Sequence, residues 1–251
     1  MFSKVKFCFA VVSCAISCVP GAYSSQDVNI INRQKVYGLE VGSTRLIYQL
    51  ESKSASLRVK NNQPYPILVQ SSVYKEDKKS EGPFIITPPI QRLEADAQTR
   101  LRVILTENNI PNNKEALFWL CVKGVPPVNI DVGDDSPMED SSTKFNVNIL
   151  SSSCIKLITR PKSVKITTEE AGKRVEWKIQ GNEVIAKNNT PVYINFSSIK
   201  FNGSDIFLRN NYIEPYSEIK FEVTKKRSQN DIEWAILDDY GVERKSQKKN
   251  I

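Results

Sequence analysis

The chain has 251 residues, more than the roughly 100 to 150 of a common single domain, so two domains are expected. Hydrophobic residues make up 40% of the chain and charged residues 25%, a composition that can bury hydrophobic cores and is not typical of disorder. There is no histidine, which excludes histidine-dependent serine and cysteine hydrolases and the HExxH zinc enzymes.

The first 24 residues have the organisation of a secretory signal peptide. Lys4 and Lys6 precede an apolar stretch over residues 7–19, and Ala22 and Ser24 are small residues that suit cleavage after about Ser24. A transmembrane anchor is the alternative, but the stretch is shorter than the roughly 20 residues that span a bilayer. A lipoprotein is a second alternative, because Val11-Val12-Ser13-Cys14 resembles a lipid-attachment box. The sequence thus predicts export without membrane insertion.

Cleavage would leave two of the five cysteines, Cys121 and Cys154. Two thiols allow one pairing, and a disulfide is expected in an oxidising compartment, with two buried free thiols as the alternative.

The positive charge of the mature chain is mild. Cleavage removes Lys4 and Lys6 and no acid, so the formal net charge falls from +7 to +5. The excess is concentrated at residues 225–227 and 244–249, which we interpret as a solvated hairpin end and a frayed C-terminus. No nucleic-acid partner is predicted.

The pattern of hydrophobic residues has a period of two and predicts an all-β chain. Short apolar runs alternate with turn-forming clusters of Asn, Pro and Gly. In chain order the predicted strands are 45–48, 55–59, 67–74, 99–105, 117–122, 144–150, 164–166, 175–179, 184–186, 192–196, 219–223 and 232–237. Pro161 favours a hinge, so we expect β-sandwiches at 25–160 and 161–251.

Residues 128–142 form the longest interruption between predicted strands. The segment contains five acidic residues together with Gly133 and Pro137, which indicates a long loop. A calcium loop is the alternative, but the EF-hand spacing is absent. In the strand that follows, Phe145, Val147 and Ile149 alternate with polar residues, a pattern that a half-buried sandwich strand would also show.

Four segments in the same order resemble the periplasmic chaperones of pilus assembly, the PapD-like family. They are FIITPPIQRL at 84–93, LFWLCVKGVPP at 117–127, IKLITRP at 155–161 and LDDYG at 237–241. The resemblance implies two immunoglobulin-like sandwiches in an L-shaped or boomerang arrangement. It also implies that pilus or surface-polymer subunits and an outer-membrane usher are the partners.

The resemblance further implies how a subunit is bound. Phe145, Val147 and Ile149 would belong to the strand called G1, which the family inserts into the subunit by donor-strand complementation, an example of β-strand addition. Arg45 and Lys156 match the two cations that hold the C-terminal carboxylate of the subunit, a task that suits a bidentate arginine and a lysine. The alternative interpretation is that both residues are ordinary surface cations.

Other residues match family positions with different roles. Glu115, Arg160 and Asp239 match charged residues between the two sandwiches, with solvated surface charge as the alternative. Pro66, Thr87 and Pro88 match a proline-based lock that governs usher engagement.

The positions of Cys121 and Cys154, the loop 128–142 and an extended first strand over 28–41 resemble the subfamily with a long loop between strands F1 and G1. Thr143 departs from this pattern, because a bulky donor residue is expected there. The donor strand therefore either begins at Phe145 or includes Val128, Ile130 and Val132 across a gap.

Two other classes of function remain as alternatives. A secreted adhesin or binding module would share the leader, the sandwiches and the disulfide, but not the two cations beside an alternating edge strand. An exported hydrolase could use paired carboxylates, but Asp238 and Asp239 are adjacent and point to opposite faces of a strand. The sequence thus predicts no enzyme, no cofactor and no metal. Self-association of the free protein through its exposed edge strand is a further hypothesis.

Overall fold

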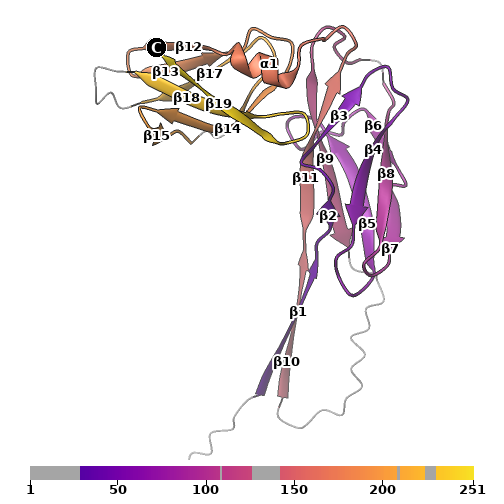
Figure 1. Cartoon of the computed structure of the whole chain (residues 1–251). Coiled ribbons are helices and arrows are strands. Elements are labelled where there is room, and N and C mark those ends of the chain that lie inside the picture. Colours follow the sequence, from indigo (N-terminus) through magenta and orange to yellow (C-terminus); the bar gives the residue numbers. More distant parts are fainter. Residues whose placement is uncertain (1–28, 108, 126–141, 208–209, 224–229) are drawn as a thin grey trace, which may run out of the picture. The chain divides into compact units, whose positions relative to one another are not determined.

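The computed structural model describes residues 29–107, 109–125, 142–207, 210–223 and 230–251, with side chains from residue 36 onward except at 142–146. The predicted signal peptide, nearly all of the predicted loop 128–142 and the basic residues 225–227 lie outside these ranges. Figure 1 shows a chain built almost wholly of strands, in two β-sandwiches, which confirms the predicted fold class. Within the described ranges no helix is long and apolar enough to cross a bilayer.

The first sandwich consists of two facing sheets. The five-stranded sheet has the order β3 (Arg45–Gln49), β11 (Ser152–Arg160), β9 (Ala116–Val125), β5 (Ile67–Tyr74) and β7 (Ile90–Leu93). The four-stranded sheet has the order β2 (Glu40–Val41), β4 (Ala55–Lys60), β8 (Gln98–Leu105) and β6 (Phe84–Thr87). Strands β3 and β11 are parallel, and this pairing sets residues distant in the sequence side by side.

Period-two burial builds the core of the first sandwich. In β5 the residues Ile67, Val69, Ser71 and Val73 are buried while their neighbours are more exposed, as expected for a strand with one face in the core. The rings of Tyr48 and Phe118 both pack edge to face on Phe84, with centroid distances of 5.4 Å and 5.1 Å.

A disulfide joins Cys121 of β9 to Cys154 of β11, which confirms the predicted pairing. The two residues lie directly opposite each other in the antiparallel register. Because the bridge joins residues 33 positions apart in the sequence, the chain-entropy argument gives it about 3 to 4 kcal/mol of stabilisation.

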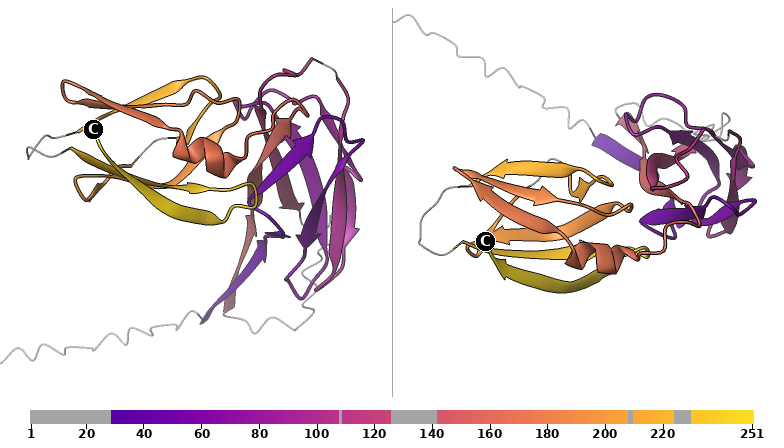
Figure 2. Two further views of the ribbon diagram at one scale, coloured as in Figure 1. Left: turned by 45° about the horizontal axis from the view of Figure 1, so that its top comes forward. Right: turned by 90° about the horizontal axis from the view of Figure 1, so that it is seen from above.

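The second sandwich pairs a three-stranded sheet with a larger one, and Figure 2 shows the two sheets lying one over the other. The first has the order β12 (Glu176–Gln180), β13 (Glu183–Lys187) and β17 (Glu218–Glu222). The second has the order β15 (Ser204–Asp205), β14 (Ile194–Phe201), β18 (Asp231–Leu237) and β19 (Glu243–Asn250), with β16 (Tyr212–Ile213) also paired to β14.

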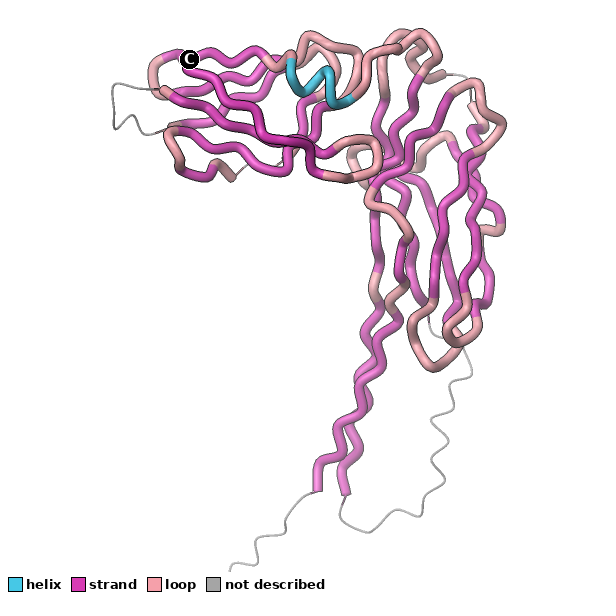
Figure 3. Tube along the Cα trace, viewed as in Figure 1, coloured by secondary structure: helices cyan, strands magenta, loops and turns pink. Residues whose placement is uncertain are grey.

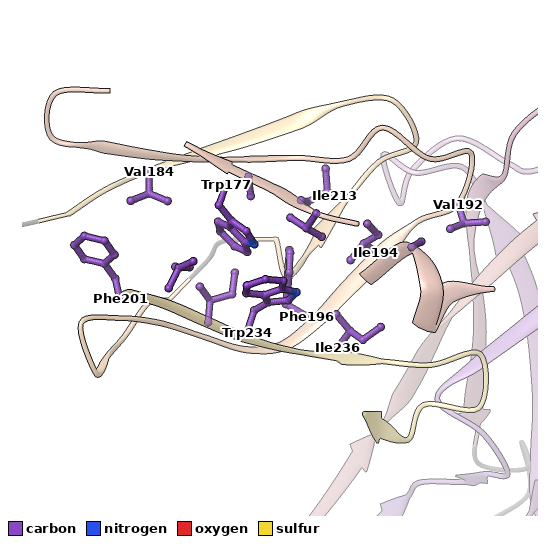
Figure 4. Close-up of a cluster of buried hydrophobic side chains, with 14 of the residues drawn as sticks. Trp177, Val184, Val192, Ile194, Phe196, Phe201, Ile213, Trp234 and Ile236 are labelled. Carbon is purple, nitrogen blue, oxygen red and sulfur yellow. The ribbon is translucent and has the colours of Figure 1, made fainter. Parts of the chain in front are cut away.

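Two tryptophans are central to the core of this sandwich. The rings of Trp177 and Trp234 lie 5.1 Å apart, with Phe196 and Ile236 beside them (Figure 4). The indole nitrogen of Trp234 donates to the carbonyl of Gly172 at 3.0 Å. A Cβ atom at position 172 would collide with Ile236, so a glycine lets the helix lie this close to the sheet.

The single short helix among the described residues, α1 (Thr168–Lys173), lies between the segments 164–166 and 175–179 that were predicted as strands. Thr167 and Glu170 form a capping box, which satisfies backbone donors at the start of the helix. The strand predicted at 164–166 is wrong, because this segment is irregular. Val164 nevertheless lies in the second core and Ile166 packs against it, so their spacing reflects burial without strand pairing.

The C-terminal segment also differs from the prediction. We expected 244–249 to be frayed, but these residues belong to β19, which pairs with β18 over its length. Arg244 forms an ion pair with the buried carboxylate of Asp238, and Lys248 forms one with Asp231 at 3.2 Å. Cross-strand ion pairs of this kind explain why a polar segment remains in the sheet.

Strands β1 (Asn29–Tyr37) and β10 (Ser142–Leu150) form a separate two-stranded sheet, visible as paired magenta strands in Figure 3. At the end of β1, the carbonyl oxygen of Tyr37 approaches β9 so closely that a Cβ atom at Gly124 would collide with it. Ser151 follows β10, and its backbone N–H donates to the same carbonyl at 3.4 Å. This short stretch of backbone connects β10 with β11.

Candidate functional site

Arg45 and Lys156 lie directly opposite each other. Arg45 is the first residue of β3 and Lys156 is the fifth of β11, and the parallel register pairs them. Opposite residues of neighbouring strands project from the same face of a sheet. The structure therefore brings together the two cations that the resemblance selected, across more than a hundred residues of sequence.

The guanidinium group of Arg45 is buried, with 6% of the residue exposed. Its Nη1 donates to the carbonyl of Leu237 at 3.4 Å, and its buried Nε has no hydrogen-bond partner among the described residues. Burial lowers the pKa of Arg45, while Asp238 and Asp239 act in the opposite direction. An arginine stays protonated in proteins, so this group presents a charge and an unused donor.

Lys156 is half-buried and has neutral partners. Its Nζ donates to the side-chain oxygens of Asn195 and of Asn211, the latter at 3.3 Å, and lies 4.4 Å from the centre of the Tyr212 ring. Burial lowers the pKa of Lys156 to about 8, and the positive charges of Arg45 and Lys78 add to this effect.

The pair has the features of an anion site. Within the described part of the chain, neither Arg45 nor Lys156 forms an ion pair with a carboxylate. Two cations held close together with no carboxylate in direct contact among the described residues favour a bound anion, and a carboxylate matches the guanidinium geometry. No cluster of metal-ligating side chains is found among the described residues.

A second charged group is centred on Arg160, the last residue of β11. Its Nε donates to Glu115 at 2.5 Å, and its Nη1 and Nη2 donate to Asp239 at 2.5 Å and 2.8 Å. Glu115 also accepts the backbone N–H of Tyr193 at 2.7 Å. The three predicted charged residues therefore form one network, and their alternative as solvated surface charges does not hold, since Glu115 is 2% exposed.

Burial decides the direction of the pKa shift of Glu115, whereas hydrogen bonds and opposite charges outweigh burial for Arg160 and Asp239. Burial raises the pKa of Glu115, and Arg160 and the backbone of Tyr193 limit the rise. Burial also opposes the charge of Arg160, yet its hydrogen bonds with Asp239 and Glu115 keep the pKa above the usual value. Asp239 is kept ionised because its bonds with Arg160 and Thr168 outweigh burial and lower its pKa.

The sequence analysis did not select several residues that contact these charged side chains. Thr168 donates its hydroxyl to Asp239 at 2.6 Å and accepts from Arg160 at 3.2 Å. Asn195, Asn211 and Tyr212 contact Lys156. A signal existed only for Asn195, a polar residue in a run of buried positions of β14.

Comparison with known proteins identifies the family. The model of the pili and flagellar-assembly chaperone PapD N-terminal domain matches residues 38–165, and that of the PapD C-terminal domain matches residues 170–248. The chain belongs to the PapD-like family of pilus-assembly chaperones. The chaperone protein SefB of Salmonella enteritidis is 44% identical over 212 residues, which cover 84% of this chain and 83% of SefB. The chaperone protein caf1M of Yersinia pestis is 36% identical over 241 residues, which cover 92% of this chain and 92% of caf1M.

Solved structures agree with this assignment. The Escherichia coli chaperone DraB superposes with a TM-score of 0.75 at 36% identity, covering 87% of this chain and 98% of DraB. A structure of the Salmonella enterica SafA pilin in complex with the SafB chaperone gives a TM-score of 0.77 at 34% identity, covering 88% of this chain and all of that one. The predicted family is thus confirmed, and its role is that of a chaperone.

In this chaperone the predicted donor residues lie in β10. Val147 and Ile149 are 41% and 40% exposed, and Leu150 is 47% exposed. Phe145 lies in the same strand, but its side chain is outside the described set. Among the described strands β10 pairs with β1 alone, so one of its edges has no partner strand. An apolar strand with an open edge is suited to strand addition.

The residues of the predicted proline lock are not brought together. Pro66 precedes β5, and Thr87 and Pro88 precede β7, while Ile67 pairs with Leu93 and Gln70 with Ile90. Because the strands are antiparallel, Pro66 and Pro88 lie toward opposite ends of the paired segment. Their role in usher engagement stays a prediction.

Proposed function

We propose that this protein is a periplasmic chaperone that binds subunits of a pilus or other surface polymer and delivers them to an outer-membrane usher. Strand β10 is added to the incomplete sandwich of the subunit, with Val147, Ile149 and Phe145 as donor residues. Arg45 and Lys156 bind the C-terminal carboxylate of the subunit. The relative SafB, whose solved structure includes a pilin, supports this assignment.

The observation that carries the proposal is a pair of cations, neither of which forms an ion pair within the described ranges, with Lys156 on the strand that follows the apolar edge strand β10. Ile149 precedes Lys156 by seven residues, roughly 23 Å of extended chain. A carboxylate fixed at Lys156 would set which subunit residues lie opposite β10. Register matters here, because a shift by one residue turns every side chain to the other face.

The experiment is a tagged pull-down from periplasmic extract of the native host, comparing wild type with Lys156→Ala and Lys123→Ala. Lys123 is an exposed lysine of β9 with no ion pair among the described residues, which makes it a matched control. We expect wild type and Lys123→Ala to recover a small β-rich subunit at about one to one, and Lys156→Ala to lose it.

Intact-mass analysis of the partner, with and without carboxypeptidase trimming, then tests the carboxylate directly. Trimmed subunit should no longer rebind to purified wild type. If Lys156→Ala recovers the subunit as well as wild type does, the anchor is wrong. If no subunit is recovered and the protein binds a host-surface ligand, the adhesin alternative replaces the chaperone function.

A further inference from the structure

The two cations of the proposed anchor belong to a longer row of residues that crosses the five-stranded sheet. The registers place Tyr74 opposite Trp119, Trp119 opposite Lys156, and Lys156 opposite Arg45. These four residues lie on neighbouring strands and share one face, with about 4.8 Å between successive strands.

A third cation reaches this row from outside the sheet. Lys78 lies in the turn between β5 and β6, and its Nζ is 3.9 Å from the centre of the Trp119 ring. Trp119 separates Lys78 from Lys156, yet the two ammonium groups are close enough that Lys78 contributes to the lowered pKa of Lys156. The row therefore carries positive charge at Arg45, at Lys156 and above Trp119.

The turn holds Lys78 in a conformation that its residue type disfavours. Asp77 accepts the backbone N–H groups of Lys79 and Ser80 at 2.8 Å and 2.9 Å, and the N–H of Lys78 donates to the carbonyl of Lys75 at 3.0 Å. Lys78 has a φ of +57°, in the left-handed region where glycine has no steric cost. A lysine at this position indicates a use for its side chain.

Donors along the row remain unused. The buried indole nitrogen of Trp119 and the buried Nε of Arg45 have no partner among the described residues. Glu76, an acid at the start of the turn, accepts a hydrogen bond from the hydroxyl of Tyr212 at 2.8 Å. Lys78 itself forms no ion pair within the described ranges.

One carboxylate cannot engage all three cations. A carboxylate bound between Arg45 and Lys156 occupies two neighbouring strands, whereas Lys78 lies over the next strand. We infer that Lys78 is a specificity-determining residue, which binds the acidic side chain of an Asp or Glu close to the C-terminal carboxylate of the subunit. This inference rests on the proposed function and names a feature of the subunit that the anchor alone would not select.

Peptides with a free C-terminus test the inference. The probes are N-acetylated hexapeptides that carry Asp, Asn or Lys at each of the last three positions in turn, together with C-terminal amides of the same sequences. Affinity is measured by isothermal titration. The indole N–H resonance of Trp119 reports binding at the row, and it is separable because the other two tryptophans, Trp177 and Trp234, lie in the second core.

For wild type we expect the Asp peptide to bind about three- to fivefold more tightly than its Asn counterpart at one position, as for a partly exposed ion pair. Lys78→Ala should remove this ratio. Lys79→Ala, a change in the same turn, should keep it. Lys78→Glu should reverse the preference, so that a Lys peptide binds better than the Asp peptide, which a purely structural role of Lys78 would not produce.

An Asp-to-Asn ratio that is the same in wild type and Lys78→Ala overturns the inference, and so does a ratio of one at all three positions in wild type. Failure of the proposed function has a different signature. In that case the free-acid and amide peptides bind equally well, and Lys156→Ala has no effect on either.

Discussion

At the scale of the residue, Lys156 connects protein stability with binding. Its pKa of about 8 lies below the ordinary 10.5, first because of burial and then because of Arg45 and Lys78. Between pH 8 and 10.5 the unfolded chain therefore binds more protons at this lysine than the folded chain does, and the free energy of unfolding rises with pH in this window. Binding of a carboxylate has the opposite dependence, because it needs the protonated amine.

We predict that affinity for a free C-terminal carboxylate falls as the pH rises from 7 to 9.5. The loss should reach about tenfold, since a charged hydrogen bond to the carboxylate disappears. Titration calorimetry with a free-acid peptide measures it. Lys156→Arg is the control and should give a nearly flat profile, because arginine stays charged. A flat profile for wild type would contradict the role of the lysine.

Arg160 is the residue whose loss should cost most within its network. Arg160→Ala would leave the buried Glu115 and the partly buried Asp239 without their cation. We expect a loss of about 3 to 5 kcal/mol in the free energy of unfolding, measured by urea denaturation at pH 8.5.

The control for this variant is the same loss in the free energy of unfolding measured at a second pH. Without Arg160 the pKa of Glu115 should rise further, because Arg160 now lowers it. Wild-type Glu115 has a pKa of about 7, so at pH 5 the carboxyl is protonated in both proteins, whereas at pH 8.5 it is charged in the wild type. The loss in Arg160→Ala should therefore be smaller at pH 5 than at pH 8.5, and Glu115→Gln in the same background should recover part of it at pH 8.5. An equal loss at both pH values would show that charge is not the cause.

At the scale of the element, the proposed function predicts that the connection between β10 and β11 fixes the register in which β10 is donated. Ser151 joins the two strands, with its backbone bonded to Tyr37 and Gly124. Because side chains alternate along a strand, one inserted residue turns the donor face of β10 away while Lys156 stays in place.

We therefore predict that one serine inserted after Ser151 abolishes co-purification of the subunit, and that two inserted serines restore part of it. Thermal melting of both variants without the subunit is the control, and it should show similar stabilities. Equal binding by the two insertions would mean that β10 and the anchor act independently.

Most strands could be predicted from period-two burial, because one face of each lies in a core. The short strands β6 and β7 were not predicted as strands, since Pro88 and Pro89 between them mark a turn. β19 was missed because its residues are polar and are held by the neighbouring strand. A repeated turn was missed as well. The segments 60–64 and 187–191 share the pattern Lys-Asn-Asn-x-Pro. In each segment the first asparagine, Asn61 or Asn188, is 0% exposed, and its side-chain amide donates to a backbone carbonyl of another segment.

At the scale of the whole molecule, the site could be predicted only in part. Arg45 and Lys156 were selected by resemblance, and the parallel register of β3 and β11 confirms that they are neighbours. Thr168, Asn195 and Tyr212 come from other segments, and no local pattern connects them with the cations. Contacts of this kind depend on tertiary packing, which a reading of periodicity and spacing does not include.

The open edge of β10 leads to a prediction about the oligomeric state of the free protein. We predict that its mass in light scattering rises with concentration between about 10 µM and 1 mM, because exposed apolar strands pair with one another. A double change, Val147→Lys with Ile149→Lys, should give a monomer. Ile85→Lys with Ile90→Lys, at exposed positions elsewhere, should not. A wild-type monomer at every concentration would contradict the prediction.

Strand β19 is a sheet edge with a very different character from that of β10. It lies at the end of its sheet, and nearly every residue from Glu243 to Asn250 is exposed, four of them lysine or arginine. A neighbouring copy that tried to continue this sheet would bring like charges together and would have to dehydrate them. In the self-association that we predict, copies can therefore pair through the apolar edge of β10, whereas the charged edge of β19 disfavours such pairing.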